Sequence, residues 1–253
     1  MTAFSANLGF LWADRSLPDA IRAAKAAGFD AVECHWPYDT PAPDIKQALK
    51  DTGLPMLGLN TRRGDVAAGE NGLCALRGRE QEALAAINEA VEYAGAIGAQ
   101  AIHVMAGVTD DPAAHDVFVG NLRAATDLAK DHGLTILIEP LNRFDAPGYF
   151  LKDTAQAVGI IEEVGADTLK LMFDCYHIGR TEGDVTGCLR AVFDHIGHIQ
   201  FASVPDRGAP DHGDVDYAAV FALIETLGWE RPLGAEYKPG LDTDASLGWL
   251  HNI

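Results

Sequence analysis

The chain has 253 residues, and 48% of them are hydrophobic, which is enough to build a sizeable core. It carries 37 acidic and 19 basic side chains, a formal charge of -18, and such an acidic surface repels the phosphates of nucleic acids. No apolar run approaches the roughly 20 residues of a membrane span, and the first ten residues lack a signal-peptide pattern. We therefore expect a cytoplasmic protein with neither a nucleic-acid nor a membrane partner.

Short apolar segments rich in Val, Ile, Leu and Phe alternate along the chain with longer segments whose apolar residues recur at helical spacing. In chain order, the expected strands are residues 5–10, 31–34, 55–60, 101–106, 135–140, 169–174, 198–202 and 233–237. The clearest helices between them are residues 17–27, 80–97, 117–132 and 154–164, and several are followed by a glycine typical of a helix C-terminus.

Eight strand-helix units in about 250 residues are typical of a (β/α)8 barrel. No GxGxxG motif follows the first strand, which disfavours a doubly wound nucleotide-binding sheet. Because no linker divides the chain, we expect an α/β fold with one domain over residues 1–253, a single-domain (β/α)8 TIM barrel. The glycine-rich segment 62–79 would lie at the C-terminal face, as an active-site lid or as an ordinary surface loop. The four cysteines form no CxxC pair and are expected to be free structural thiols.

Four polar side chains stand at the ends of strands or within strands that should be apolar. Glu139, Asp174 and Glu236 are acids in such segments, and Gln200 is an amide. They are separated by 35, 26 and 36 residues, each close to one strand-helix unit. The four side chains should therefore come from four consecutive strands and converge at the C-terminal mouth of the barrel, where barrel enzymes place their chemistry.

Three carboxylates that converge repel one another unless a cation neutralises them. For any one of them, a helix cap or a lysine partner is the alternative explanation. Three acids and one amide form an oxygen-only ligand set, which suits Mg2+ or Mn2+ better than zinc. The sequence thus predicts one divalent metal ion, Mg2+ or Mn2+, bound by Glu139, Asp174, Gln200 and Glu236.

The motifs around these four positions resemble those of the hydroxypyruvate isomerase family, which belongs to the xylose isomerase-like barrels. The motifs are IEPLNRFD from position 138, FDCYH from 173, GHIQ from 197 with VPDRG from 204, and GAEYKP from 234. The resemblance runs nearly end to end and implies conversion of hydroxypyruvate to tartronate semialdehyde. Related epimerases usually have histidine where this chain has Gln200. Arg62 and Arg63 depart from the family pattern, which leaves hydroxypyruvate and a four-carbon 2-oxo acid both open as substrates.

Such an isomerisation moves a proton between neighbouring carbons through an enediolate, whose charge a divalent metal stabilises. Glu139 and Glu236 come from strands separated by two others, which could place them on opposite sides of the substrate as base and acid. We therefore expect these two glutamates to be catalytic.

The partner we expect is a small anionic hydroxy-carbonyl substrate, and a homo-oligomer is compatible with the sequence. Arg207 is the best candidate to bind the substrate carboxylate, with a surface ion pair as its alternative. His177 could donate a hydrogen bond to a substrate oxygen or lie in a solvated loop. His103 and Lys238 could line the pocket or be structural. Trp12 and Trp36 could form its wall or pack in the core.

Three other functions fit parts of the pattern. A ketose 3-epimerase or an inosose-type dehydratase would share the metal and the glutamate pair. A metal-dependent endonuclease on the same barrel would need further metal ligands and a basic surface, neither of which is apparent. A non-catalytic sugar-binding barrel would not need to keep Glu139 and Glu236.

Overall fold

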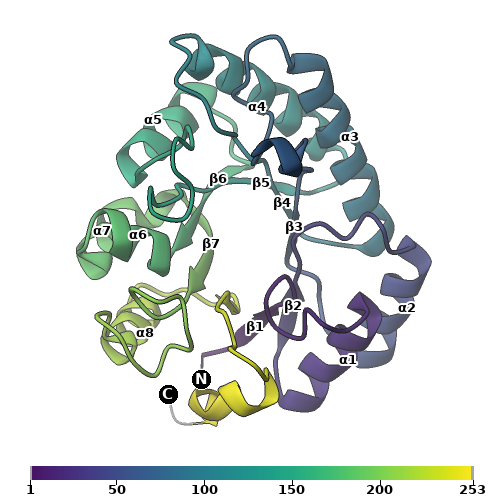
Figure 1. Ribbon diagram of the computed structural model, residues 1–253, viewed down its shortest axis with the longest axis vertical. Coiled ribbons are helices and arrows are strands. Elements are labelled where there is room, and N and C mark those ends of the chain that lie inside the picture. Colours follow the sequence, from purple (N-terminus) through teal and green to yellow (C-terminus); the bar gives the residue numbers. More distant parts are fainter. Residues whose placement is uncertain (1, 252–253) are drawn as a thin grey trace.

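Eight parallel strands form the centre of the computed structural model, which describes residues 2–251 (Figure 1). Both ends of the expected span 1–253 lie outside the described residues. The strands are β1 Phe4–Asn7, β2 Ala31–Glu33, β3 Gly58–Asn60, β4 Ala101–His103, β5 Thr135–Ile138, β6 Leu169–Asp174, β7 Ile196–Phe201 and β8 Leu233–Ala235. Their order in the sheet is β2-β1-β8-β7-β6-β5-β4-β3.

The two outer strands of this order, β2 and β3, meet and nearly close the sheet into a barrel. Val32 forms a parallel bridge with Met56. The Val32 N–H donates to Pro55 O at 3.0 Å, and the Leu57 N–H donates to Val32 O at 2.7 Å. The predicted (β/α)8 barrel is therefore confirmed.

Helices surround the barrel (Figure 1). They are α1 Leu17–Ala27, α2 Ala42–Thr52, α3 Glu80–Ile97, α4 Ala114–Lys130, α5 Thr154–Val164, α6 Cys175–Thr181, α7 Val185–Val192 and α8 Tyr217–Thr226, with 3-10 helices η1 Val66–Ala68, η2 Phe193–His195 and η3 Asp244–His251. Within the described part of the chain, no helix is long and apolar enough to cross a membrane.

Local sequence signals define the helix ends. Ser16 caps α1 by accepting a hydrogen bond from the Asp19 N–H, and Gly28 ends the helix in the left-handed region at φ 97°. Asp174, the last residue of β6, also caps α6 by accepting from the Tyr176 N–H. This strand-to-helix junction places one predicted metal ligand at the start of a helix that carries His177.

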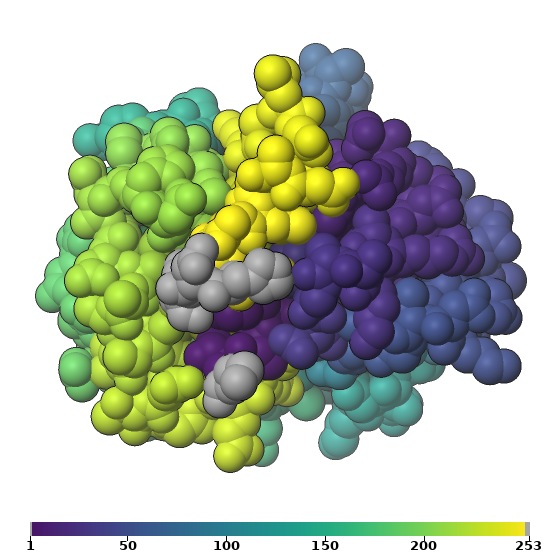
Figure 2. All heavy atoms as spheres, turned by 90° about the horizontal axis from the view of Figure 1, so that it is seen from below, coloured from purple at the N-terminus to yellow at the C-terminus, as the bar shows by residue number. Residues whose placement is uncertain are grey.

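The C-terminal segment packs against one side of the barrel. In Figure 2 it lies between the N-terminal part of the chain and the segment around α8. The Trp249 ring packs edge-on against Phe4 at 5.1 Å and against Phe201 at 5.4 Å between ring centroids. These contacts join η3 to β1 and β7, two strands whose ends carry site residues.

Several predicted elements were too long. The first strand stops at Asn7, not at residue 10, because the Leu11 N–H donates to Asn7 O at 2.9 Å and turns the chain. The fourth stops at His103, because Thr61 Oγ1 and the Tyr149 hydroxyl accept from the N–H groups of residues 105 and 106. The helix expected over 117–132 was not too long but displaced, since it spans Ala114–Lys130. All four cysteines are free.

Candidate active site

The ends of four consecutive strands carry the four predicted ligands. Glu139 directly follows β5, Asp174 ends β6, Gln200 lies in β7 and Glu236 directly follows β8. Asp174 and Gln200 are register partners across β6 and β7, so their side chains start side by side. All four residues are at most 6% exposed. The structure therefore places all four residues, buried, at neighbouring strand ends in the barrel mouth. Of the three predicted acids, Glu139 and Asp174 belong to a group whose ligand atoms lie within 4.8 Å of one another, and Glu236 lies outside that group.

Three of these side chains have an oxygen without a hydrogen-bond partner. Glu139 Oε1, Asp174 Oδ2 and Gln200 Oε1 are buried and accept no hydrogen bond from any described residue. Buried polar atoms are nearly always partnered, and leaving one unpaired costs about 1–3 kcal/mol. Three such oxygens in one place indicate a missing ligand, and their chemistry fits a hard divalent cation.

The carboxylates also disturb one another electrostatically. Burial and the nearby charges of Glu236 and Asp174 raise the pKa of Glu139 well above its usual value. Burial and Glu236 raise the pKa of Asp174 to about 7. Without a further cation, the three acids cannot all be ionised easily near neutral pH.

Glu236 has a different environment because cationic and neutral donors surround it. Its Oε1 accepts from Asn7 Nδ2 at 3.0 Å and lies 2.9 Å from His35 Nε2, and its Oε2 accepts from Arg207 Nη2. Burial opposes its ionisation, but Arg207 and His35 outweigh that effect, and the pKa of Glu236 falls below its usual value. Glu236 is therefore the most readily ionised of the three acids.

Arg207 lies inside the site, where the prediction of a substrate-binding role requires it. Its guanidinium is 3.7 Å from Asp174 Oδ2 and 3.8 Å from Asp145 Oδ2, in addition to its bond with Glu236. The rings of Phe10 and Tyr176 each lie 4.9 Å from its Cζ. Only 12% of the side chain is exposed. Arg207 therefore forms ion pairs, as the alternative supposed, but with the buried acids of the site and not at the surface.

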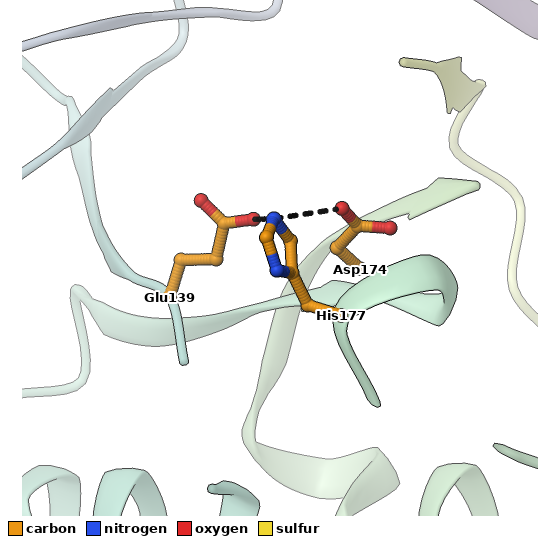
Figure 3. A group of neighbouring side chains, drawn as sticks. All are labelled: Glu139, Asp174 and His177. Atoms are coloured by element: carbon orange, nitrogen blue, oxygen red, sulfur yellow. Dashed lines mark ion pairs between the residues drawn. The ribbon is translucent and has the colours of Figure 1, made fainter. Parts of the chain in front are cut away.

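His177 points its Nε2 between the carboxylates of Glu139 and Asp174, at 3.9 and 3.6 Å (Figure 3). Its Nδ1 accepts a hydrogen bond from the Asn142 N–H at 2.9 Å. Burial lowers the pKa of His177 to about 3, so the ring is neutral. Because Nδ1 is the acceptor, the single ring proton is on Nε2 and faces the site.

This tautomer decides between two roles for His177. Glu139, Asp174 and His177 each offer a ligand atom, and the three atoms lie within 4.8 Å of one another, so together they could hold a metal ion. A ring nitrogen that carries a proton cannot bind a metal, however, while Nδ1 keeps its bond to Asn142. The geometry therefore favours His177 as a hydrogen-bond donor and leaves the unpartnered oxygen of Gln200 as the better fourth ligand.

Of the remaining predicted residues, His103 and Trp36 lie at the site, whereas Lys238 is exposed and Trp12 lies in the core. His103 is buried with Nδ1 3.5 Å from Glu139 Oε2, and burial lowers its pKa to about 4. The Trp36 ring lies 5.0 Å from the ring of His35, next to the site. Lys238 is exposed, and its backbone N–H donates to Arg207 O at 2.7 Å. Trp12 packs in the core, with its ring 6.1 Å from that of Phe29.

Sequence reasoning missed a buried glutamate beneath the site. Glu33 ends β2, and its carboxylate accepts from Asn7 Nδ2 at 3.0 Å and from Gln200 Nε2 at 2.7 Å. Its other oxygen lies 2.7 Å from His198 Nε2. An acid at the end of an apolar strand was the signal that identified Glu139, and the segment AVE at positions 31–33 carries the same signal.

Comparison of the sequence with known proteins shows that the chain belongs to a family of barrels. Residues 21–253 match the family described as xylose isomerase-like TIM barrel. The chain is 43% identical to 2-oxo-tetronate isomerase from Cupriavidus necator, over 99% of this chain and 98% of that protein. It is 37% identical to hydroxypyruvate isomerase from Escherichia coli, with the same coverage of both chains.

Solved structures with the same architecture bear names that indicate several different functions. A protein from Brucella melitensis that is named AP endonuclease, family 2 superposes with a TM-score of 0.96, at 36% identity and over 99% of this chain and 98% of that one. A 3-keto-D-glucoside 4-epimerase from E. coli superposes with a TM-score of 0.83 at 22% identity, over 100% of both chains, which shows a common fold alone.

Proposed function

Because the chain belongs to the xylose isomerase-like TIM barrel family, in its hydroxypyruvate isomerase branch, we propose that it moves the carbonyl group of a small 2-oxo acid to the neighbouring hydroxyl-bearing carbon. Hydroxypyruvate, which would give tartronate semialdehyde, and 2-oxo-tetronate are the two substrates that the names of the relatives suggest. The observation that carries the proposal is the set of three unpartnered oxygens, on Glu139, Asp174 and Gln200, at the ends of consecutive strands.

One divalent metal ion, Mg2+ or Mn2+, would be held by Glu139, Asp174, Gln200 and Glu236. The donor set is oxygen only, which these two ions prefer. When bound, such an ion neutralises the acids and acts as a Lewis acid toward the substrate oxygens. Of these four residues, Glu236 is the one whose carboxylate oxygens both contact protein groups, and it would join the ligand set from the position where it contacts Arg207, Asn7 and His35.

Glu139 and Glu236 would move the proton between the two carbons. Their surroundings push their pKa values in opposite directions, upward for Glu139 and downward for Glu236. Such a divergence separates an acid from a base. Glu236 therefore removes a proton from the hydroxyl-bearing carbon, and Glu139 delivers one to the neighbouring carbonyl carbon. The hydroxyl proton passes to the former carbonyl oxygen, and the two glutamates regain their starting protonation by exchange with solvent. In the reverse reaction the two exchange roles.

Two further residues would orient the substrate. His177 Nε2–H faces the site and donates to the oxygen that gains charge in the enediolate. Arg207 is the buried cation closest to the acids, and its planar guanidinium suits a substrate carboxylate. Arg207 Nε is buried and has no hydrogen-bond partner among the described residues, and a substrate without a carboxylate, such as a ketohexose, would offer it no anionic group. This favours a 2-oxo acid over the polyols of the 3-epimerases and inosose-type dehydratases.

Endonuclease activity, which the name of the Brucella melitensis protein indicates, does not suit this chain. The net charge of -18 opposes binding to the phosphates of nucleic acids. Among the described residues, the acids and histidines close enough to hold a metal ion form a single group, at Glu139, Asp174 and His177, whereas an endonuclease of this kind would need further ligands.

The test is the isomerisation of hydroxypyruvate and of 2-oxo-tetronate in D2O, followed by proton NMR at low conversion. Proton transfer through Glu139 and Glu236 predicts deuterium at the carbon that receives the proton, whereas a hydride shift would retain the original hydrogen. Glu139→Gln should lower kcat roughly 100-fold or more, the usual scale for removing an acid-base group. The matched control is Glu230→Gln, which changes an exposed glutamate and should have normal kcat. Unlabelled product, or near-normal turnover of Glu139→Gln, would contradict the proposal.

A further inference from the structure

A second cavity lies outside the acidic site, between the loop that follows β5 and the end of α6. Its volume is about 270 Å3, and its lining combines three cationic side chains, Arg143, Lys152 and Arg180, with a largely apolar wall that includes Leu141 and Tyr149. No acidic residue is among those that line it. A water molecule needs only about 10–15 Å3 of such space, so a small organic anion has ample room.

These three cations are unpaired in a protein with almost twice as many acids as bases. Elsewhere on the surface, some arginines, such as Arg22, Arg62 and Arg79, form ion pairs with neighbouring acids, and other bases form none. What distinguishes Arg143, Lys152 and Arg180 is that they line one cavity. Within residues 2–251, no ion pair is formed by Arg143, Lys152 or Arg180. In addition, Arg180 Nε is buried and has no hydrogen-bond partner. An orphaned buried donor and two unpaired charges together indicate an absent anion.

The acids nearest in sequence do not line the cavity, and each is oriented by a contact with another group. Asp145 accepts from Asn142 Nδ2 and lies near Arg207. Asp153 caps α5 by accepting from the Gln156 N–H at 2.8 Å. Glu182 accepts from both the N–H and the hydroxyl of Thr154. The positive charge of the cavity is therefore a property of how these segments fold.

An exposed aromatic ring holds the two guanidinium groups in place. The Cζ atoms of Arg143 and Arg180 lie 4.9 and 4.2 Å from the centroid of the Phe144 ring. Stacking on an aromatic ring restricts a guanidinium and leaves its N–H groups free to bind an anion. Phe144 itself is 55% exposed, so its ring stands at the surface next to the cavity.

We propose that this cavity binds a small, multiply charged oxoanion, carrying a phosphate group or two carboxylates, between Arg143, Lys152 and Arg180. This cavity is separate from the acidic site, but the same two segments of the chain carry residues of both. Arg180 is one helical turn beyond His177 on α6, and Arg143 follows Asn142, whose N–H fixes the tautomer of His177. A bound anion would thus contact the two segments that hold His177.

Isothermal titration of the purified protein with inorganic phosphate, and separately with malonate, tests the proposal at constant ionic strength, with chloride as the monovalent comparison. Wild type should bind at least one of the two dianions and not chloride. Arg180→Gln should weaken that binding roughly tenfold or more, since a charge-assisted contact is lost. Arg190→Gln is the matched control, because Arg190 is an exposed arginine on the neighbouring α7, and it should bind as wild type does.

Lys152→Gln provides a second variant that cannot easily unfold the protein, because Lys152 is exposed, and it should also weaken binding. Three results would overturn the proposal. The first is that wild type binds neither dianion. The second is that Arg180→Gln and Lys152→Gln both retain full affinity, which would place the anion elsewhere, for example at Arg207. The third is equal weakening in Arg190→Gln, which would show only a general effect of net charge.

Discussion

Arg207 is the residue on which the charge balance of the site depends. Its side chain is nearly buried, donates to Glu236 and lies within 4 Å of Asp174 and Asp145. Its backbone has φ 59°, in the left-handed region that few residues other than glycine adopt. That turn, in which the Arg207 N–H donates to Ser203 O at 2.9 Å, directs the side chain inward. A cation held there offsets the acids and remains close to an incoming substrate.

Replacing Arg207 with lysine should separate these two contributions. Lysine keeps the charge but loses the planar fork, so the contact with a substrate carboxylate weakens by about 1.5–3 kcal/mol. KM for the 2-oxo acid should rise tenfold or more, while turnover of an uncharged hydroxy-ketone such as dihydroxyacetone stays nearly unchanged. Steady-state kinetics on both substrates measure this. Arg62→Lys, at a surface pair with Glu89, is the control, and an equal loss on both substrates would point to a structural role for Arg207.

Glu33, at the end of β2, lies beneath the site and contacts residues of three other strands, β1, β7 and β8. Asn7 is the register partner of Glu33, and Gln200 is the register partner of Gly234. A Cβ at position 234 would lie 2.7 Å from Glu33 Oε1, so this strand position needs glycine to leave room for the carboxylate. Because Glu33 accepts the Nε2 hydrogen of Gln200, the Oε1 of Gln200 is turned into the site.

Glu33→Gln should therefore weaken metal binding without removing a ligand. The new amide cannot accept from Asn7, Gln200 and His198 together, and the Gln200 amide can then rotate its nitrogen toward the metal. Loss of such a supporting contact usually lowers metal affinity about 10–100-fold. Titration with Mn2+ measures the affinity, and the melting temperature without metal monitors the fold. Glu182→Gln removes a comparable carboxylate acceptor far from the metal and should bind Mn2+ normally. Unchanged affinity in Glu33→Gln would show that Gln200 needs no such support.

At the scale of the whole molecule, the site concentrates negative charge inside a protein that already carries -18. Burial and Glu236 raise the pKa of Asp174 to about 7, so the folded protein without metal binds a proton there that the unfolded chain releases near pH 4. Protonation of Asp174 therefore stabilises the folded state at low pH, and this contribution to the free energy of unfolding is lost as pH rises through about 7. A metal ion would replace that proton as the stabilising charge.

The stabilisation by metal should therefore increase with pH. The ion must displace the proton from Asp174 and also from Glu139, whose pKa is raised as well, so each pH unit below about 7 should weaken Mn2+ binding at least about tenfold. Thermal melting with and without Mn2+ at about pH 5 and about pH 8 measures the difference, since binding to the folded state raises its stability. Asp174→Asn should show a small shift at both values. A wild-type shift that is the same at both pH values would contradict this account.

The amino-acid sequence by itself determined the barrel and the identity of the four candidate ligands. The strand and helix rhythm is a local pattern, and Glu139, Asp174, Gln200 and Glu236 stand out because polar groups are costly in buried strands. Strand ends were predicted less well, because they depend on acceptors such as Thr61 and Tyr149 from other segments. A hydrophobic pattern along one segment contains no information about these partners.

Only the tertiary structure decided which group each site residue contacts. Closure of the barrel brings β1 and β2 beside β8 and β7, and this places Glu33 under Gln200 although 167 positions separate them. It also turns Arg207 toward the acids and gives His177 the tautomer that donates into the site. These contacts depend on distance and direction in space, since hydrogen bonds and ion pairs act over a few ångströms whatever the separation along the chain.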